Sequence, residues 1–110
     1  MVRTIFLLIL LSTSVLAGNI YVCEYEYQAD ICVFVVDYEY QADLSAFQVD
    51  YAYQAADEDA LWYFVEYDYQ ADVRIFYTDY EYQADLTVFF VDYEYQAEWN
   101  GESEFKGLLH

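Results

Sequence analysis

The residues of this chain that carry the most chemistry are carboxylates, which recur at fixed positions of a repeated motif. The candidates are Asp37, Glu39, Asp79, Glu81, Asp92 and Glu94. Ca²⁺ prefers several oxygen ligands, and carboxylates supply them. One hypothesis is therefore a divalent-cation site on this acidic face. The chain lacks a twelve-residue calcium loop and the glycine that such a loop needs. The alternative is a solvated acidic face that maintains solubility.

Nucleophilic catalysis has little support in this sequence. The only histidine is the last residue, His110, and beyond the N-terminal segment serine occurs only at Ser45 and Ser103. These residues offer no pairing of a nucleophile with a base. The regular repetition of the carboxylates also argues against one unique acid–base pair. We therefore predict that the protein is not an enzyme and needs no cofactor.

The two cysteines, Cys23 and Cys32, allow two interpretations. In an exported protein they would form one disulfide that closes a short loop. Alternatively, they are buried free thiols that pack as small hydrophobic groups. Their spacing fits no zinc-binding pattern, so a metal site of the Cys/His type is not expected.

The charge balance restricts the partners. Three Lys and Arg stand against 21 Asp and Glu, a formal net charge of −18. Phosphate backbones repel such a surface, so we expect no nucleic acid partner. Anionic membrane surfaces are disfavoured for the same reason. Cations or a basic protein are the partners that this charge favours. An aromatic content of 23% argues for a packed domain and against disorder.

A repeat organises the elements that must position these side chains. The motif Tyr-x-Tyr-Gln-Ala begins at Tyr25, Tyr38, Tyr51, Tyr67, Tyr80 and Tyr93. The steps between copies are 13, 13, 16, 13 and 13 residues. The one longer step divides the array into three copies and three copies. We infer a pseudo-twofold domain built from two half-domains.

Alternation within each repeat predicts a β-strand. The residues Phe34, Val36, Tyr38 and Tyr40 are apolar or aromatic, and those between them are largely polar. This period of two indicates a strand whose Tyr/Phe/Val side is buried. The glutamines would then satisfy the buried tyrosine hydroxyls. The structural residues on this interpretation are Tyr38, Tyr40, Gln41, Tyr80, Tyr82 and Gln83. An aromatic platform that binds a ligand is the alternative.

The odd repeat length predicts a corner in every repeat. Thirteen residues of continuous strand would place successive copies on opposite faces, so a bend must restore the phase. The Gln-Ala-Asp step suits that bend, and its Asp would cap local backbone N–H groups. The array contains neither Pro nor Gly, so we expect continuous bends between paired segments. The result is an all-β barrel or prism of six to seven strands, which leaves no exposed edge.

The chain divides into three predicted segments. Residues 1–17 have the charged start, the apolar run and the small residues of a secretory signal peptide. A retained N-terminal anchor is the alternative, although the apolar run is shorter than the roughly 20 residues that span a bilayer. Residues 18–101 form the repeat domain, which Glu98, Trp99 and Asn100 cap. Residues 102–110 are predicted to be a disordered tail. After cleavage we expect no membrane association, and a periplasmic or secreted location.

The tandem units also resemble a known family, the bacterial septoil-knot domains. The resemblance rests on units such as Tyr38-Glu39-Tyr40-Gln41-Ala42-Asp43 and on the closing Gln96-Ala97-Glu98-Trp99-Asn100. It implies a small all-β domain whose backbone forms a deep seven-crossing knot. It implies no catalytic residues. The chain departs from the pattern in a three-residue insertion near Ala56 and in Ala52, which replaces an acidic residue.

These observations lead to one functional prediction and two alternatives. The prediction is an exported, non-catalytic repeat domain that serves as a structural or partner-binding module. One alternative is binding of divalent cations such as Ca²⁺ on the acidic face. The other is an assembling fibre, because aromatic strands without proline can pair edge to edge.

Overall fold

Short strands and single-turn 3-10 helices alternate along the chain in this computed structural model, which describes residues 18–55 and 58–109. The strands are β1 (Asn19–Val22), β2 (Ile31–Val35), β3 (Leu44–Gln48), β4 (Leu61–Phe64), β5 (Val73–Tyr77), β6 (Leu86–Phe90) and β7 (Glu98–Trp99). The 3-10 helices are η3 (Glu26–Gln28), η4 (Glu39–Gln41), η5 (Ala52–Ala55), η6 (Asp68–Gln70), η7 (Glu81–Gln83) and η8 (Glu94–Gln96). The predicted all-β class is confirmed. The predicted signal peptide lies outside the described residues, among which no helix has the length and apolarity to cross a membrane.

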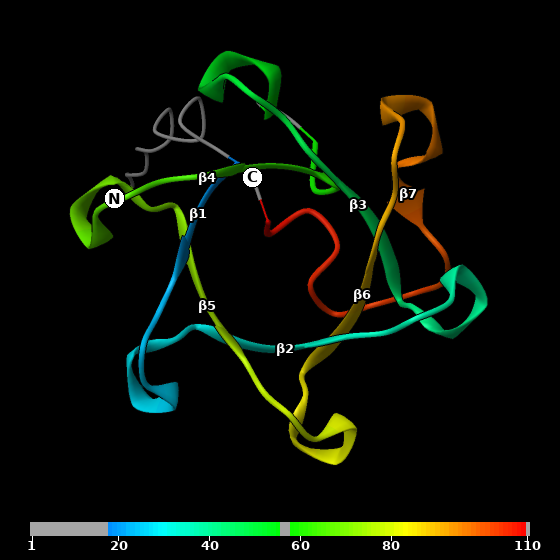
Figure 1. Ribbon diagram of the computed structural model, residues 1–110, viewed down its shortest axis with the longest axis horizontal. Helices are drawn as coiled ribbons and strands as arrows, with labels where there is room; N and C mark the ends of the chain where they lie inside the picture. The colour runs from blue at the N-terminus through cyan, green and yellow to red at the C-terminus, as the bar shows by residue number, and fades with distance from the viewer. Residues whose placement is uncertain (1–17, 56–57, 110) are drawn as a thin grey trace, which may run out of the picture.

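Six parallel strands close into a barrel (Figure 1). Around the ring the order is β4-β1-β5-β2-β6-β3, and a further pairing of β3 with β4 closes it. The short strand β7 pairs antiparallel with the start of β3, while β4 pairs with its end. A closed ring leaves no unpaired edge strand, as the sequence predicted.

The two halves of the repeat array are interleaved in this ring. The strand β1 lies between β4 and β5, β2 between β5 and β6, and β3 between β6 and β4. Every pairing in the ring therefore joins a strand of the first three to a strand of the last three. The 3+3 division is real, but it does not produce two separate half-domains. The expected bends between paired neighbours exist only from β3 to β4, because no other consecutive strands pair.

The register explains how parallel strands connect through short segments. Parallel neighbours ordinarily need a crossover of about a dozen or more residues. Here Val22 at the end of β1 is level with Ile75, and Ile75 is level with Ile31 at the start of β2. Each strand thus begins at the level where the previous one ended. The chain winds onward around the ring, and residues 23–30 suffice to connect β1 with β2.

The interior of the ring holds aliphatic side chains from alternate strand positions. Val33, Leu44 and Val88 are fully buried there. Trp62 is 1% exposed and packs edge-on against Phe64 and Phe90, with ring centroids 6.0 and 5.6 Å away. A small barrel has an interior just wide enough for such side chains, so this packing forms the main core.

Within the strands the main core lies on the face opposite to the predicted one, but Val36, which follows β2, is buried as predicted. In β2 the side chains of Ile31 and Val33 line the interior, and Phe34 is half-buried on the other face. Both faces of this strand are apolar, so alternation alone does not choose between them. In this strand the aliphatic Ile31 and Val33 belong to the core cluster, while Phe34 faces outward.

The strands also end earlier than predicted. β2 ends at Val35, the N–H of Val36 donates to a carbonyl of β6 at 2.9 Å, and the backbone then leaves the ring to form η4. The tyrosines assigned to the core, Tyr38, Tyr40, Tyr80 and Tyr82, are 57–84% exposed. Their assignment to the core is wrong. The alternation of polar and apolar residues continues without a break from the strand into the corner. For this reason the alternation predicted a strand that is longer than the observed one.

The C-terminal segment enters the ring and packs against the core (Figure 1). Leu109 is 1% exposed, and Phe105 packs against the same cluster. The Asp59 carboxylate accepts hydrogen bonds from the N–H groups of Leu109, at 3.0 Å, and of Gly107. It also accepts one from Nε1 of Trp99 at 2.9 Å. The predicted disordered tail is therefore wrong for residues 102–109.

A tyrosine at the end of β5 makes the fold sensitive to alkali. Tyr77 packs against the core cluster, and its burial raises its pKa to about 12. An unfolded tyrosine ionises near pH 10. Because the folded pKa is the higher one, this contribution to stability is complete below pH 10 and is lost as the pH rises through 12. We expect the unfolding free energy to fall less steeply between pH 10 and 12 in Tyr77→Phe than in the wild type. Parallel curves from urea titrations would contradict this assignment.

Candidate functional site

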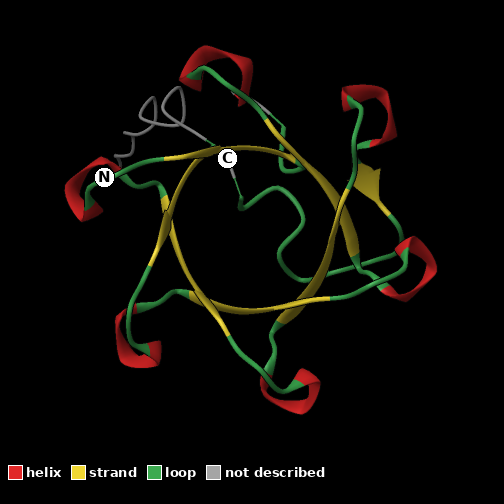
Figure 2. Cartoon of the chain, in the orientation of Figure 1, coloured by secondary structure: helices red, strands yellow, loops and turns green. Residues whose placement is uncertain are grey.

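Six corners project from the ring, each with a 3-10 helix (Figure 2). In each corner one tyrosine precedes the 3-10 helix and a second lies within it. We call each corner a tyrosine arm. The pairs are Tyr25 and Tyr27, Tyr38 and Tyr40, Tyr51 and Tyr53, Tyr67 and Tyr69, Tyr80 and Tyr82, and Tyr93 and Tyr95. Ring centroids within a pair are 5.6–5.8 Å apart, with planes 10–30° from parallel. The first ring is 52–60% exposed and the second, the outer tyrosine, 77–84% exposed. Five arms thus present a stacked aromatic pair to solvent, and in the sixth the rings of Tyr80 and Tyr82 are tilted by 30°.

Glutamine side chains fix the backbone of most arms. The Gln28 Oε1 atom accepts a hydrogen bond from the N–H of Tyr25 at 3.1 Å, and Gln54, Gln70 and Gln96 make the equivalent bond. Gln83 instead accepts from Oγ1 of Thr78 at 2.9 Å. The predicted pairing of glutamines with buried tyrosine hydroxyls is therefore wrong. A Gln three residues after the start of the corner acts as a cap, similar to the second half of a capping box.

The corner aspartates join each arm to a distant strand. Asp30 donates its N–H to the carbonyl of Arg74 at 2.8 Å, and its Oδ2 atom accepts the N–H of Arg74 at 2.9 Å. We call this pair of bonds an aspartate bracket. Four brackets are present: Asp30–Arg74, Asp43–Thr87, Asp72–Asn19 and Asp85–Cys32. The carboxylates do bind backbone N–H groups, as predicted. The prediction of local bonds is wrong, because each bond joins residues 44 or 53 positions apart.

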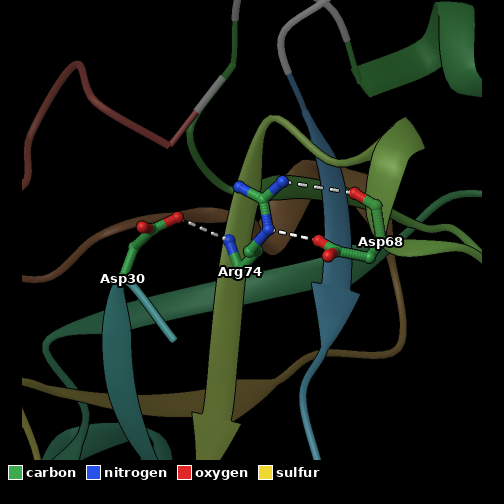
Figure 3. A network of polar contacts seen from close by, with 3 residues as sticks. All are labelled: Asp30, Asp68 and Arg74. Atoms are coloured by element: carbon green, nitrogen blue, oxygen red, sulfur yellow. Dashed lines mark hydrogen bonds and ion pairs between the residues drawn. The ribbon is translucent and has the colours of Figure 1, made fainter. Parts of the chain in front are cut away.

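Arg74 gives one arm an internal cation (Figure 3). Its Nε donates to the Asp68 carboxylate of η6, and a terminal nitrogen donates to the carbonyl oxygen of Asp68 at 3.5 Å. Arg74 stands six residues after the acid of its arm. At the same spacing, Ser45 donates its hydroxyl to Glu39 at 3.2 Å. The strand residue that follows each arm therefore contacts that arm's acid in both cases.

The acidic residues proposed as cation ligands lie on three separate arms. Asp37 and Glu39 belong to the arm of η4, and all six candidates are exposed. Within the described part of the chain, no group of three or more His, Cys, Asp or Glu is placed to hold a metal ion. The repeat brings the carboxylates to equivalent positions but does not bring them together.

Both cysteines are free thiols and are buried. Burial raises the pKa of Cys23, and the charge of Asp68 raises it further. Burial also raises the pKa of Cys32. A raised pKa reduces the thiolate fraction, so neither thiol is activated as a nucleophile.

Hollows lie beside the arms, and two of them are lined by residues that the structure describes. The first, about 290 Å³, is lined by Tyr21, Cys23, Tyr27, Gln28, Asp68 and Arg74. The second, about 240 Å³, lies beside the C-terminal segment and is lined by Asp30, Ile31, Asp72, Val73, Phe105 and Leu108. Burial raises the pKa of Asp72, against the lowering effect of its hydrogen bond from Asn19. The first hollow is lined by Tyr27 of the η3 arm together with Asp68 of the η6 arm and Arg74 of β5.

The fold defines a class of small all-β protein in which interleaved parallel strands close a six-stranded ring. Residues 17–100 match the family model described as the 7(1) septoil knot domain, and the chain belongs to this family. The resemblance stated from the tandem motif is thereby confirmed. Searches of curated proteins and of solved structures found no match. The family has no known molecular function.

Proposed function

We propose that this protein is a non-catalytic binding module, exported to the periplasm or secreted, whose barrel presents the tyrosine arms to a partner. One observation carries the proposal: twelve tyrosines are 52–84% exposed, while aliphatic residues and Trp62 form the buried core. Large exposed aromatic surfaces mark interaction sites, and tyrosine is enriched in protein interfaces. The export part rests on the N-terminal sequence pattern alone.

The architecture supports a display role for these tyrosines. The arm backbone is held by glutamine caps and aspartate brackets, and the ring by its β-ladders. None of these bonds uses a tyrosine hydroxyl. The aromatic rings are therefore available for contacts with another molecule at little cost to the fold.

The proposal predicts that the outer tyrosines are dispensable for folding. We expect Tyr82→Ser to lower the unfolding free energy by less than about 1 kcal/mol, since exposed positions contribute little. A sixfold variant with Tyr27, Tyr40, Tyr53, Tyr69, Tyr82 and Tyr95 replaced by serine should remain folded. We call it the outer-tyrosine variant. Far-UV circular dichroism and urea unfolding measure both effects.

A structural role would give the opposite result. If the outer-tyrosine variant loses its cooperative unfolding transition, or if Tyr82→Ser costs more than about 2 kcal/mol, the tyrosines brace the fold and the display proposal fails. A control with the exposed acids Asp37, Asp79 and Asp92 changed to serine separates loss of aromatic rings from a general effect of surface substitution.

A further inference from the structure

We propose that the tyrosine arms bind arginine side chains of a basic protein segment, an inference that rests on the proposed function and names its partner class. Its starting point is the arm that already holds an arginine. There the Arg74 guanidinium donates to the carboxylate and to the carbonyl oxygen of Asp68. The ring of Tyr27, from a neighbouring arm, lines the same hollow. A guanidinium, a carboxylate and an open tyrosine thus line one hollow of the described structure.

The arm of η7, one repeat after the arm of η6, has an equivalent arrangement without the arginine. One repeat later the equivalent residues are Tyr40, Glu81 and Thr87. The Asp43–Thr87 bracket has bonds of 3.0 and 3.1 Å, against 2.8 and 2.9 Å for Asp30–Arg74, so the backbone geometry is the same. Threonine is too short to place a cation beside the Glu81 carboxylate. This carboxylate makes no hydrogen bond with any residue that the structure describes.

Further arms also lack an internal cation. Six residues after Glu26 and Glu39 stand Cys32 and Ser45, which are likewise short. The only basic side chains among the described residues are Arg74, paired with Asp68, and Lys106, whose Nζ lies 3.6 Å from Glu102. The chain therefore leaves its excess of negative charge, formally −18, to be matched by a partner.

The arms favour arginine over lysine. A planar guanidinium can stack on an open tyrosine face while it donates two hydrogen bonds to a carboxylate. An ammonium group offers only a compact, strongly hydrated charge. The molecule is 49 Å long, so one arginine-rich segment would contact several arms at once. Several weak contacts made by one segment raise its overall affinity. The partner class is therefore a protein segment rich in arginine.

The test compares two peptides of equal charge. Binding of octa-arginine and octa-lysine to the full protein is measured by isothermal titration calorimetry at about 0.15 M salt, where long-range attraction is screened. We expect octa-arginine to bind at least about fivefold more tightly, because each exposed cation–π contact contributes a factor of roughly two to five. The outer-tyrosine variant keeps the net charge of the wild type, and it should lose this preference.

Three further variants test the proposed binding position on the arms. Thr87→Arg should occupy the position beside Glu81 with an internal guanidinium and weaken octa-arginine binding. Arg74→Thr should vacate the position beside Asp68 and strengthen it. Because the charge changes would shift octa-lysine binding too, the decisive quantity is the ratio of the two affinities. Glu81→Gln should lower that ratio without adding a bulky side chain.

The outcomes separate this inference from the proposed function. Equal affinity for the two peptides, or a preference that survives in the outer-tyrosine variant, would show attraction by charge alone and overturn the arginine inference. An outer-tyrosine variant that fails to fold would overturn the display proposal itself. A folded variant that loses the preference, together with opposite changes in Thr87→Arg and Arg74→Thr, supports both.

Discussion

Replacement of Trp62 by alanine is expected to lower the unfolding free energy by about 3–5 kcal/mol, the usual cost of removing a buried aromatic side chain. Trp62 is 1% exposed and contacts Phe64 and Phe90 inside the ring. Its Nε1 atom also donates to the Asp59 carbonyl at 2.7 Å. Because the Asp59 carboxylate holds the C-terminal segment, this change should loosen that segment as well. A small domain with a total stability of about 5–15 kcal/mol would lose much of it.

Urea unfolding measures this cost, with Tyr40→Ala as the matched control. Tyr40 is also aromatic but is 84% exposed, so its loss should cost less than about 1 kcal/mol. Trp62→Phe separates the two contributions, since it retains an aromatic ring and removes the indole N–H. Equal losses in Trp62→Ala and Tyr40→Ala would mean that the ring interior is not the main core.

Removal of a bracket carboxylate is the second change with a large expected effect. Asp85→Ala should lower the unfolding free energy by about 1–3 kcal/mol, because it leaves the N–H of Cys32 without its acceptor at 2.9 Å. Asp43→Ala should act similarly on the N–H of Thr87, whose acceptor lies at 3.1 Å. The charge of the carboxylate strengthens these bonds beyond those of neutral partners.

Backbone hydrogen exchange locates the effect. The Cys32 amide should exchange faster in Asp85→Ala and the Thr87 amide faster in Asp43→Ala. Asp85→Asn retains an acceptor oxygen and should cost less than Asp85→Ala. The exposed Asp37 serves as the control, and Asp37→Ala should leave the unfolding free energy within about 0.5 kcal/mol of the wild type. A similar loss in Asp37→Ala would show a general charge effect and not a bracket.

The repeat predicted much of the architecture correctly. The odd thirteen-residue step required a corner in each repeat, and the corners are where η3 to η8 lie. The longer step near Ala56 predicted the 3+3 division, and the need to avoid edges predicted closure. These features depend on local spacing, so the linear sequence contains them.

The strand order and the buried face depend on contacts that local spacing does not encode. In β2 both Val33 and Phe34 are apolar, and the ring closure that places Val33 in the core cluster has no local signal. The brackets join residues 44 or 53 positions apart, so Asp43 and Thr87 show no relation in the linear sequence. The exposure of Tyr40 did have a local signal, because Gln41 begins the step predicted to bend and the strand had to end before it.

The interleaving of the two halves has a consequence for the order in which the chain can fold during synthesis. Since each ring pairing joins β1, β2 or β3 to β4, β5 or β6, a nascent chain that ends before β4 contains no strand pair of the native ring. The ladder between β3 and β6 requires Phe90. Closure of the ring therefore waits until residues up to Phe90 have left the ribosome, and pairings this distant in sequence form slowly.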